Sequence, residues 1–194
     1  DQAMVERGLA DSLETARALI MAARVRVDGQ PAAAPGQRVS SDGDISLDTG
    51  PEYYGRGGIK LASALDHFQL AVKGMTALDV GASTGGFTHC LLQRGARRVY
   101  ALDVGYGQLD YRLRQDPRVV VMERVNARYP FSLGEEVDLV TVDVSFISLT
   151  KVLPSVAEHL KAGGLIVALV KPQFEARRDE VGRKGVIRDT RVHA

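Results

Sequence analysis

The chain has no tryptophan, a single cysteine and few aromatic residues, which make up 6% of its 194 residues. One cysteine, Cys90, excludes a disulfide framework, and we expect it to pack as a small apolar residue. No cluster of His and Cys has the spacing of a zinc site, and we therefore expect no metal. The longest aliphatic run, residues 165–170, is far shorter than a membrane span, and no signal-peptide pattern opens the sequence. We therefore expect a cytoplasmic protein with no membrane partner.

The chain also lacks an excess of either charge, because 25 basic and 24 acidic side chains give a net charge of +1. The distribution is uneven, since residues 94–128 carry eight basic and four acidic side chains and residues 171–194 carry seven and four. Two basic segments beside a neutral body suit a polyanionic partner. The alternative, which charge alone favours, is a solvated helix and loop surface carrying Arg94, Arg97, Arg98, Arg112 and Arg114.

What the sequence does contain is a glycine-rich turn between an apolar strand and a helix. Residues 78–88 read LDVGASTGGFT, and Phe87, Leu91 and Leu92 give the following helix an apolar face. Glycines allow the backbone to approach a ligand closely, and the first N–H groups of the helix then face that ligand. Strand, glycine loop and helix form the nucleotide-cofactor unit of doubly wound α/β folds.

Three motifs compete for this loop. A dinucleotide site expects G-x-G-x-x-G, but Ser83 replaces the second glycine. Residues 81–85 also match the G-x-S-x-G elbow of serine hydrolases, and Asp143 and His159 follow in the appropriate chain order. That elbow normally follows several strands of the sheet, which are not expected here. The third motif, D-x-G-x-[GS]-x-G with Asp79 before the turn, resembles the S-adenosylmethionine loop of class I methyltransferases, and we favour it.

The polar residues at the ends of later strands fit a cofactor site. Asp103 is placed to accept hydrogen bonds from a cofactor ribose, although a strand-end carboxylate also caps turns. Asn126 suits either a contact to the base edge or the start of a turn, and we expect Asp79 to hold the glycine loop in place. Strands alternating with helices predict a parallel sheet with right-handed crossovers, and we expect strands over residues 76–80, 98–104, 119–123, 137–143 and 165–170.

Candidate catalytic residues follow the fourth and fifth strands. Asp143 lies at the carboxyl edge of the predicted sheet, where ligands bind in such folds. Val144 and Ser145 stand where enzymes that methylate amines usually carry prolines, which favours an oxygen acceptor. Lys171 is a candidate for a pKa lowered by burial and by a nearby cation, which Lys60 would supply. The alternative is that each lysine is an ordinary surface residue with no catalytic role.

Residues 1–50 have the pattern of a separate small α+β domain. Leu13, Ala16 and Ile20 share one face of a predicted helix, and Asp11 precedes it as a capping-box residue. The glycine-rich residues 51–58 predict a linker.

This small domain is similar to the alpha-L RNA-binding module of ribosomal proteins and pseudouridine synthases, through residues 6–9, 16–20 and 24–30. The resemblance implies contacts to structured RNA from Arg17, Arg24 and Arg26. It also implies that the first helix of the module is clipped at Asp1.

The remaining motifs, and essentially the whole chain, resemble the TlyA family. They are RGGIKL at 56–61, DVGASTGGFT at 79–88, DVGYGQL at 103–109, DVSFIS at 143–148, VKPQFE at 170–175 and GVIRD at 185–189. The resemblance implies a Rossmann-like class I methyltransferase domain of the FtsJ type over residues 59–194. It further implies that the last strands of the sheet are missing from this sequence.

The family's activity is 2′-O-methylation of ribose in ribosomal RNA, with S-adenosylmethionine as cofactor and ribosomal subunits as partners. Its Lys-Asp-Lys-Glu tetrad corresponds to Lys60, Asp143 and Lys171, with the glutamate expected beyond Ala194 because Glu175 is too close to Lys171. Arg56 joins the RNA-binding residues. The implied cofactor residues are Asp79, Gly81, Ser83, Thr84, Gly85, Gly86, Phe87, Asp103, Val104 and Asn126.

Two other functions remain open from the sequence. A catalytically silent ribosome-binding factor would bind RNA and cofactor without transferring a methyl group. A membrane-lytic protein, as the hemolysin label of the family suggests, is disfavoured because no amphipathic membrane segment is present.

Overall fold

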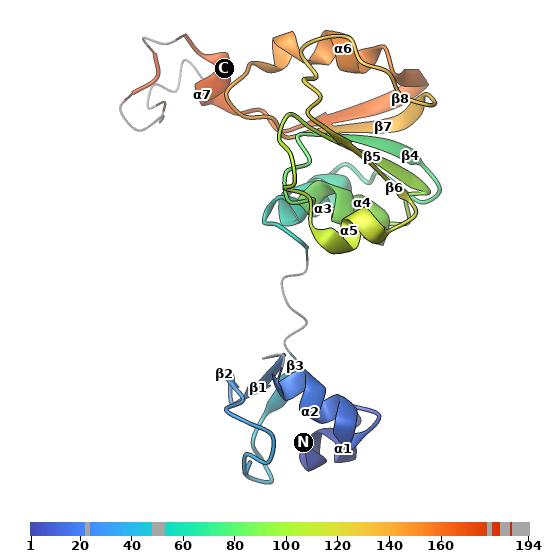
Figure 1. Ribbon diagram of the computed structural model, residues 1–194. Helices are drawn as coiled ribbons and strands as arrows, with labels where there is room; N and C mark the ends of the chain where they lie inside the picture. The colour runs from blue at the N-terminus through green and yellow to red at the C-terminus, as the bar shows by residue number, and fades with distance from the viewer. Residues whose placement is uncertain (22–23, 48–52, 178–179, 183–186, 188–194) are drawn as a thin grey trace. The chain divides into compact units, whose positions relative to one another are not determined.

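The chain divides into two units, Asp1–Glu52 and Tyr53–Ala194, which are described separately (Figure 1). The computed structural model describes residues 1–21, 24–47, 53–177, 180–182 and 187.

The amino-terminal unit packs two helices against a small antiparallel sheet with the strand order β2-β1-β3. Its core is formed by Met4, Ala16, Ile20, Val25 and Ile45, all of them buried. The elements are α1 (Gln2–Glu6), α2 (Leu13–Met21), β1 (Val25–Val27), β2 (Gln30–Pro31) and β3 (Ile45–Leu47).

The start of α2 differs from the predicted capping box. The Thr15 N–H donates to the Ser12 hydroxyl at 3.1 Å, so Ser12 rather than Asp11 caps the helix. Both residues are good cap types, and the first apolar position, Leu13, does not distinguish them.

The second unit is a five-stranded parallel sheet with the order β6-β5-β4-β7-β8. The first strand of the unit is therefore central, as in doubly wound folds. Its elements are α3 (Gly57–His67), β4 (Thr76–Val80), α4 (Gly86–Gln93), β5 (Arg98–Asp103), α5 (Tyr111–Gln115), β6 (Val119–Glu123), β7 (Val137–Val142), the 3₁₀ helix η1 (Leu149–Lys151), α6 (Leu153–Ala157), β8 (Leu160–Ala168) and α7 (Pro172–Glu175).

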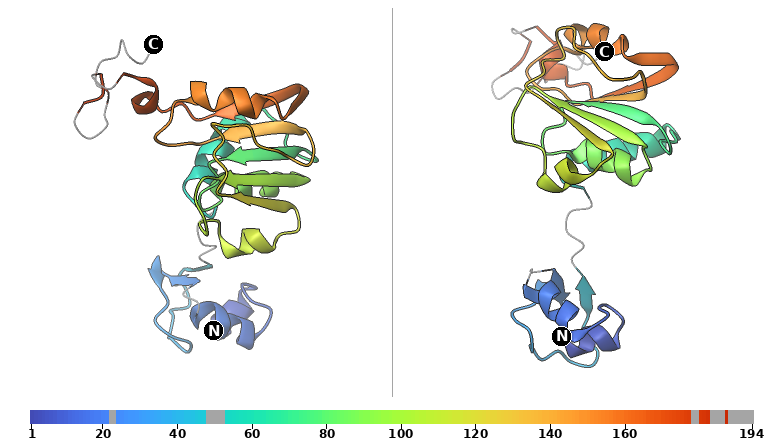
Figure 2. Two further views of the ribbon diagram at one scale, coloured as in Figure 1. Left: turned by 45° about the horizontal axis from the view of Figure 1, so that its top comes forward. Right: turned by 45° about the vertical axis from the view of Figure 1, so that its right-hand side comes forward.

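Helices cover both faces of this sheet (Figures 1 and 2). One core lies under α3, α4 and α5 and includes Leu61, Leu91 and Val99. The other lies under η1 and α6 and includes Leu78 and Val156. The central strand β4 is buried along its whole length, which explains its unbroken apolar pattern.

Two boundaries differ by more than two residues from the sequence-based expectation. Residues 53–58 belong to the second unit rather than to a linker, because Tyr53 is buried against Gly58 and α3 begins at Gly57. The glycines there allow close packing, which composition alone does not distinguish from flexibility. Strand β8 begins at Leu160, which pairs with Val137 of β7, and the register shifts before Leu165, which pairs with Leu139.

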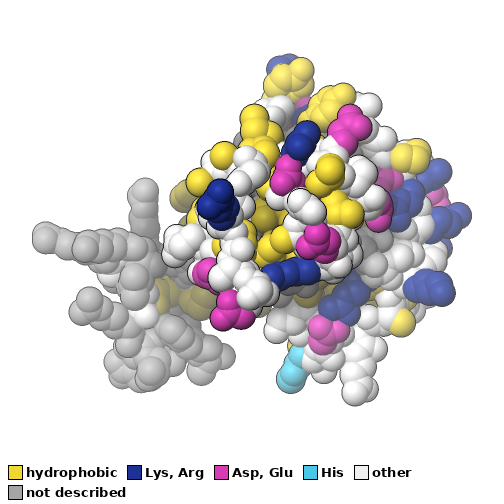
Figure 3. Space-filling view, turned by 90° about the horizontal axis from the view of Figure 1, so that it is seen from below, with side chains coloured by type: hydrophobic (Ala, Val, Ile, Leu, Met, Phe, Trp, Pro, Cys, Tyr) yellow, Lys and Arg dark blue, Asp and Glu magenta, His cyan; other side chains and the backbone are white. Residues whose placement is uncertain are grey.

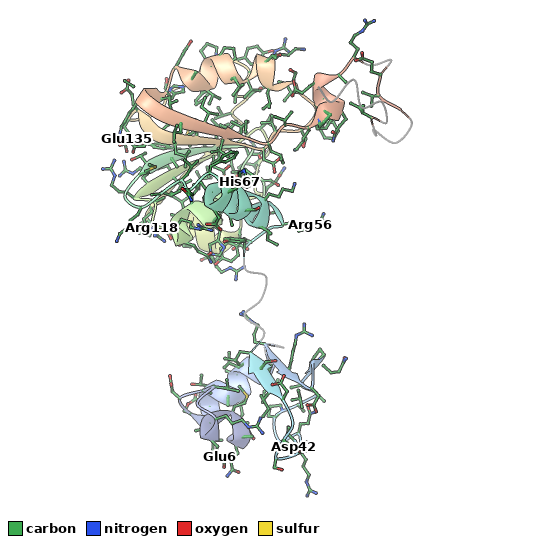
Figure 4. The ribbon with its side chains drawn as sticks, turned by 180° about the vertical axis from the view of Figure 1, so that it is seen from behind. Glu6, Asp42, Arg56, His67, Arg118 and Glu135 are labelled. Atoms are coloured by element: carbon green, nitrogen blue, oxygen red, sulfur yellow. The ribbon has the colours of Figure 1, made fainter. Side chains whose placement is uncertain are left out.

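An ion-pair network closes the amino edge of the sheet. Glu135 accepts hydrogen bonds from Arg97 at 3.0 Å and Arg98 at 2.8 Å, and Arg97 also donates to the Thr76 hydroxyl at 2.6 Å. Figure 4 shows Glu135 at the end of the sheet away from α7. The candidate site lies at the opposite, carboxyl edge.

Candidate functional site

The glycine loop after β4 is held by the carboxylate at the end of β5. Asp103 accepts hydrogen bonds from the Ser83 N–H at 2.8 Å and from the Gly105 N–H at 2.7 Å. The turn-capping role considered for this residue is therefore present. A carboxylate has about four lone-pair sites, so Asp103 retains the capacity to accept further hydrogen bonds from a ligand.

Two glycines in this loop have backbone conformations that side chains rarely adopt. Gly81 has φ +86°, and a Cβ there would lie 2.5 Å from the carbonyl oxygen of Asp143. Gly85 has φ +96°, and a Cβ there would meet Leu109 at 2.8 Å. Both positions require glycine because the loop packs closely against its neighbours.

Asp79, near the end of β4, links the start of α4 to β7 through hydrogen bonds to two threonines. Its buried carboxylate accepts hydrogen bonds from the Thr88 hydroxyl at 2.7 Å and the Thr141 hydroxyl at 3.3 Å. Burial raises the pKa of Asp79 to about 7, against the lowering effect of these hydrogen bonds, and the nearby Asp143 raises it further.

A hollow of about 400 Å³ opens beside the glycine loop at the carboxyl edge of the sheet. The loops after four strands contribute to its lining, which includes Gly81, Ser83, Asp103, Val104, Gln108, Asn126, Asp143 and Phe146. The side chain of Asn126 accepts a hydrogen bond from the Arg128 N–H at 3.0 Å, so this residue starts a turn and also faces the hollow.

A smaller hollow adjoins the first and shares Gly81, Ser83 and Asp143 with it. It extends to the start of α3, and its lining also includes Arg56, Gly57, Thr84, Gly86 and Phe87. Asp143 thus lies where the two hollows meet.

Asp143 and Lys171 form an ion pair at this junction. The Asp143 carboxylate and the Lys171 amine are 2.6 Å apart, and each side chain is 19% exposed. Lys171 also donates to the Val144 carbonyl and to the Ser145 hydroxyl, both at 2.9 Å. The pair forms because β7 and β8 are parallel neighbours, so the segments that follow them leave the sheet side by side.

Lys60 forms no ion pair with Asp143. It is exposed in the first turn of α3, and among the described residues it forms no ion pair. The same turn nevertheless begins near Asp143, because a Cβ on Gly57 would lie 3.9 Å from the Asp143 carboxylate. The structure therefore brings together two of the three residues that correspond to the tetrad.

The candidate RNA-binding arginines differ in their surroundings. Arg17 pairs with Asp1 at 2.8 Å, and Arg26 donates to the Gly29 carbonyl at 3.2 Å. Arg56 is exposed just before α3, as Figure 4 shows. Arg24 is half-buried and directly precedes β1. On the face seen in Figure 3, basic and acidic side chains are interspersed.

Sequence reasoning missed several groups at this edge. Thr88 and Thr141 hold Asp79, Gln108 lines the larger hollow, and Phe146 is 91% exposed with a φ of +65°. Glu175 binds the segment after β7 rather than Lys171. No local pattern signals a contact between residues so far apart in the chain. The GVIRD motif lies outside the described residues except for Ile187.

Comparison with known proteins agrees with this arrangement. The model of the FtsJ-like methyltransferase family matches residues 53–194, and the S4 domain model matches residues 1–45. A Mycobacterium tuberculosis protein named 16S/23S rRNA (cytidine-2′-O)-methyltransferase TlyA is 50% identical over 198 residues, covering 100% of this chain and 74% of that protein. The chain belongs to the TlyA family of FtsJ-like methyltransferases.

Other TlyA-family relatives carry a different name. Hemolysin A of Brachyspira hyodysenteriae is 41% identical, covering 97% of this chain and 80% of that protein. A solved Streptococcus thermophilus structure, described as that of a hemolysin, has a TM-score of 0.72 and 42% identity, covering 98% of this chain and 71% of its own. In the part of the chain that the structure describes, no helix is long and apolar enough to cross a membrane, and no group of three or more His, Cys, Asp or Glu side chains could hold a metal ion.

Proposed function

We propose that this TlyA-family protein transfers a methyl group from S-adenosylmethionine to a ribose 2′-hydroxyl of ribosomal RNA, at a cytidine as the names of its relatives suggest. The observation that carries the proposal is the Asp143–Lys171 pair, which lies at the rim of the hollow beside the glycine loop. An acid–lysine pair at this edge suits an oxygen acceptor, which must lose a proton to become a good nucleophile.

The residues around the larger hollow fit S-adenosylmethionine. Gly81 has no side chain, so a ligand in the hollow can approach the backbone closely there. Asp103 can still accept hydrogen bonds from ribose hydroxyls. We propose that these two residues, with Ser83, Gln108 and Asn126, hold the cosubstrate. When bound it supplies an activated methyl group on a positively charged sulfur. The protein's own contribution is alignment and removal of the acceptor proton.

On the acceptor side, we propose that Lys171 first loses one proton to solvent, that its neutral amine then takes the proton of the 2′-hydroxyl, and that Asp143 orients the lysine. The contacts of Lys171 with Asp143, Val144 and Ser145 support this assignment, because they fix the amine at the junction of the two hollows. Lys60, in the turn of α3 that begins near Asp143, would supply a second positive charge beside Lys171. An acceptor that is itself the 2′-hydroxyl also accounts for selection of RNA over DNA.

Two kinds of surface support RNA as the substrate. The amino-terminal unit matches the S4 domain, and it carries Arg24 and Arg26 as candidate contacts. In the catalytic unit, the Arg124 guanidinium stacks 4.4 Å from the ring centre of Tyr106, and Arg128 lies 5.6 Å from that of Tyr129. Exposed aromatic and guanidinium planes of this kind suit unstacked RNA bases and phosphates.

The test is transfer of labelled methyl from S-adenosylmethionine to purified ribosomal subunits by the full-length protein, followed by nucleoside analysis. We expect label in a 2′-O-methylnucleoside. Lys171→Ala should reduce transfer by at least about a hundredfold, because the acceptor keeps its proton, while the Kd for S-adenosylmethionine changes little. Substantial transfer by the variant would show that Lys171 is not the base. Cofactor binding by the native protein without any transfer would instead favour a silent ribosome-binding factor.

A further inference from the structure

The segments that follow β7 and β8 are joined by more than the Asp143–Lys171 pair. One segment, residues 143–148, carries Asp143 and lines the larger hollow with its central residues. The other, residues 171–175, carries Lys171 and forms α7. At the ends of the two segments, Glu175 forms a second connection by hydrogen bonding to Ser148 and Leu149.

Both oxygens of the Glu175 carboxylate are engaged in this second connection. One accepts a hydrogen bond from the Ser148 hydroxyl at 2.6 Å, and the other from the Leu149 N–H at 2.9 Å. Ser148 in turn caps η1, since its hydroxyl accepts from the Thr150 N–H at 3.2 Å. Because Leu149 and Val152 are buried in the core, Glu175 ties α7 to a fixed point of the fold.

Between the two connections lies Phe146. Its ring is 91% exposed, and its φ of +65° is one that residues other than glycine rarely adopt. The ring contacts Phe174, with 5.3 Å between ring centres. A strained conformation persists only when its surroundings impose it. Here the Lys171 contacts hold one end of the strained loop and Glu175 holds the other.

We propose that Glu175 is a positioning residue for methyl transfer. By hydrogen bonding to Ser148 and Leu149, it keeps residues 144–148 and α7 at a fixed separation, which sets Phe146 and Lys171 for the acceptor nucleotide. The proposal rests on the proposed function. Glu175 acts through hydrogen bonds rather than through its charge, and it touches neither cosubstrate nor reacting atoms.

The test compares Glu175→Ala with Glu175→Gln in the full-length protein. Gln keeps an acceptor for the Leu149 N–H, and its amide can donate to Ser148, whose hydroxyl can then donate to the Thr150 hydroxyl 2.7 Å away. We expect Glu175→Ala to lower kcat for ribosomal RNA by about ten- to a hundredfold, and Glu175→Gln to stay within about threefold of the native protein. The Kd for S-adenosylmethionine should stay within about threefold for both.

Two controls separate positioning from general stability. Glu158→Ala removes an exposed glutamate at the end of α6 and should leave kcat and Tm unchanged. Ser148→Ala removes one partner of Glu175, and its effect on kcat should not add to that of Glu175→Ala, because both break one connection. A purely structural role would instead lower Tm and weaken cosubstrate binding together with kcat.

A measurement that needs no activity keeps this proposal distinct from the proposed function. Hydrogen exchange at the Leu149 amide should accelerate in Glu175→Ala and stay slow in Glu175→Gln. Transfer by Glu175→Ala at the native rate would overturn the proposal, and so would a Glu175→Gln variant as inactive as Glu175→Ala, which would make the charge essential. If the native protein transfers no methyl group while the exchange pattern holds, the proposed function fails and the Glu175 connection stands.

Discussion

At the scale of single residues, the buried Asp79 couples stability to pH. Its pKa is raised to about 7, chiefly by burial, so the folded state holds the proton more tightly than the unfolded chain does. The stabilisation from this proton is complete below about pH 4 and is lost as pH rises through about 7. At pH 8 the fold therefore contains an ionised carboxylate next to the core.

We expect Asp79→Asn to remove this penalty, since the amide stays neutral at every pH. Relative to the native protein, its free energy of unfolding should rise by roughly 1–4 kcal/mol between pH 5 and pH 8, as measured by urea denaturation. Asp66→Asn is the control, because Arg94 lowers the pKa of that exposed carboxyl and its difference from the native protein should be constant over this range. A constant difference for Asp79→Asn as well would contradict the assignment.

How far single residues can be predicted from the sequence depends on where their partners lie. The position of Asp103 after a strand indicated its place beside the glycine loop, because loop and strand are neighbours in the unit that the motif defines. Glu175 could not be placed in the same way, because its partners lie 26 and 27 residues away and no periodicity connects them. Ser12 replaced Asp11 as the cap because two good cap residues stand side by side.

At the scale of elements, α3 and α4 cross at two glycines. A Cβ on Gly86, at the start of α4, would lie 2.9 Å from the Gly58 nitrogen and 3.1 Å from the Gly55 carbonyl oxygen. Both neighbours are backbone atoms, which cannot turn aside. Gly86→Ala should therefore destabilise the fold by roughly 1–3 kcal/mol, although alanine is ordinarily the better helix former.

The loss should appear both in the urea midpoint and in a weaker Kd for S-adenosylmethionine, because the displaced helix carries the glycine loop. Gly57→Ala is a matched control for stability. It occupies the equivalent position in α3, and a Cβ there would lie 3.3–3.4 Å from the Phe87 ring, which can adjust, and 3.9 Å from the Asp143 carboxylate, an ordinary contact distance. Equal stability of Gly86→Ala and the native protein would show that the two helices can separate without cost.

How well an element is predicted from the sequence depends on whether its contacts are local. Strands β4 and β6 match the predicted residues because each is an apolar run with polar or glycine-rich ends. The predicted linker failed because glycines at 55, 57 and 58 permit close helix contact, and a glycine-rich segment has the same composition whether it is packed or extended. Strand β8 starts early because Leu160 pairs with Val137 of β7, a contact outside the local sequence.

At the scale of the whole molecule, the excess of arginine in residues 94–128 is mostly neutralised. Six of these arginines form ion pairs with acidic residues, at Arg94, Arg97, Arg98, Arg112, Arg114 and Arg118. Counting charges along the sequence thus overstates the basic surface. Among the described residues, Arg124 and Arg128 form no ion pair and stack on tyrosines instead.

Arg124 and Arg128 lie after β6 and flank Asn126, so they stand beside the hollow proposed for the cosubstrate. The Arg124 N–H donates to the Gly105 carbonyl at 3.0 Å, which fixes this loop against the one that carries Tyr106. An unpaired arginine releases counterions when it meets a phosphate, whereas a paired one must first lose its acidic partner. These two residues should therefore contribute more to RNA affinity than the six paired arginines.

We expect the double variant Arg124→Ala/Arg128→Ala to raise the Kd for ribosomal subunits about tenfold at moderate salt and to reduce the slope of log Kd against log salt by about two. Arg98→Ala, which removes a paired arginine at the opposite edge of the sheet, should leave the Kd within about twofold and the slope unchanged. Binding titrations at several salt concentrations measure both quantities. Equal losses of RNA affinity from the paired and unpaired arginines would contradict this prediction. RNA binding would then depend on the total charge of the domain and not on whether an arginine has an acidic partner.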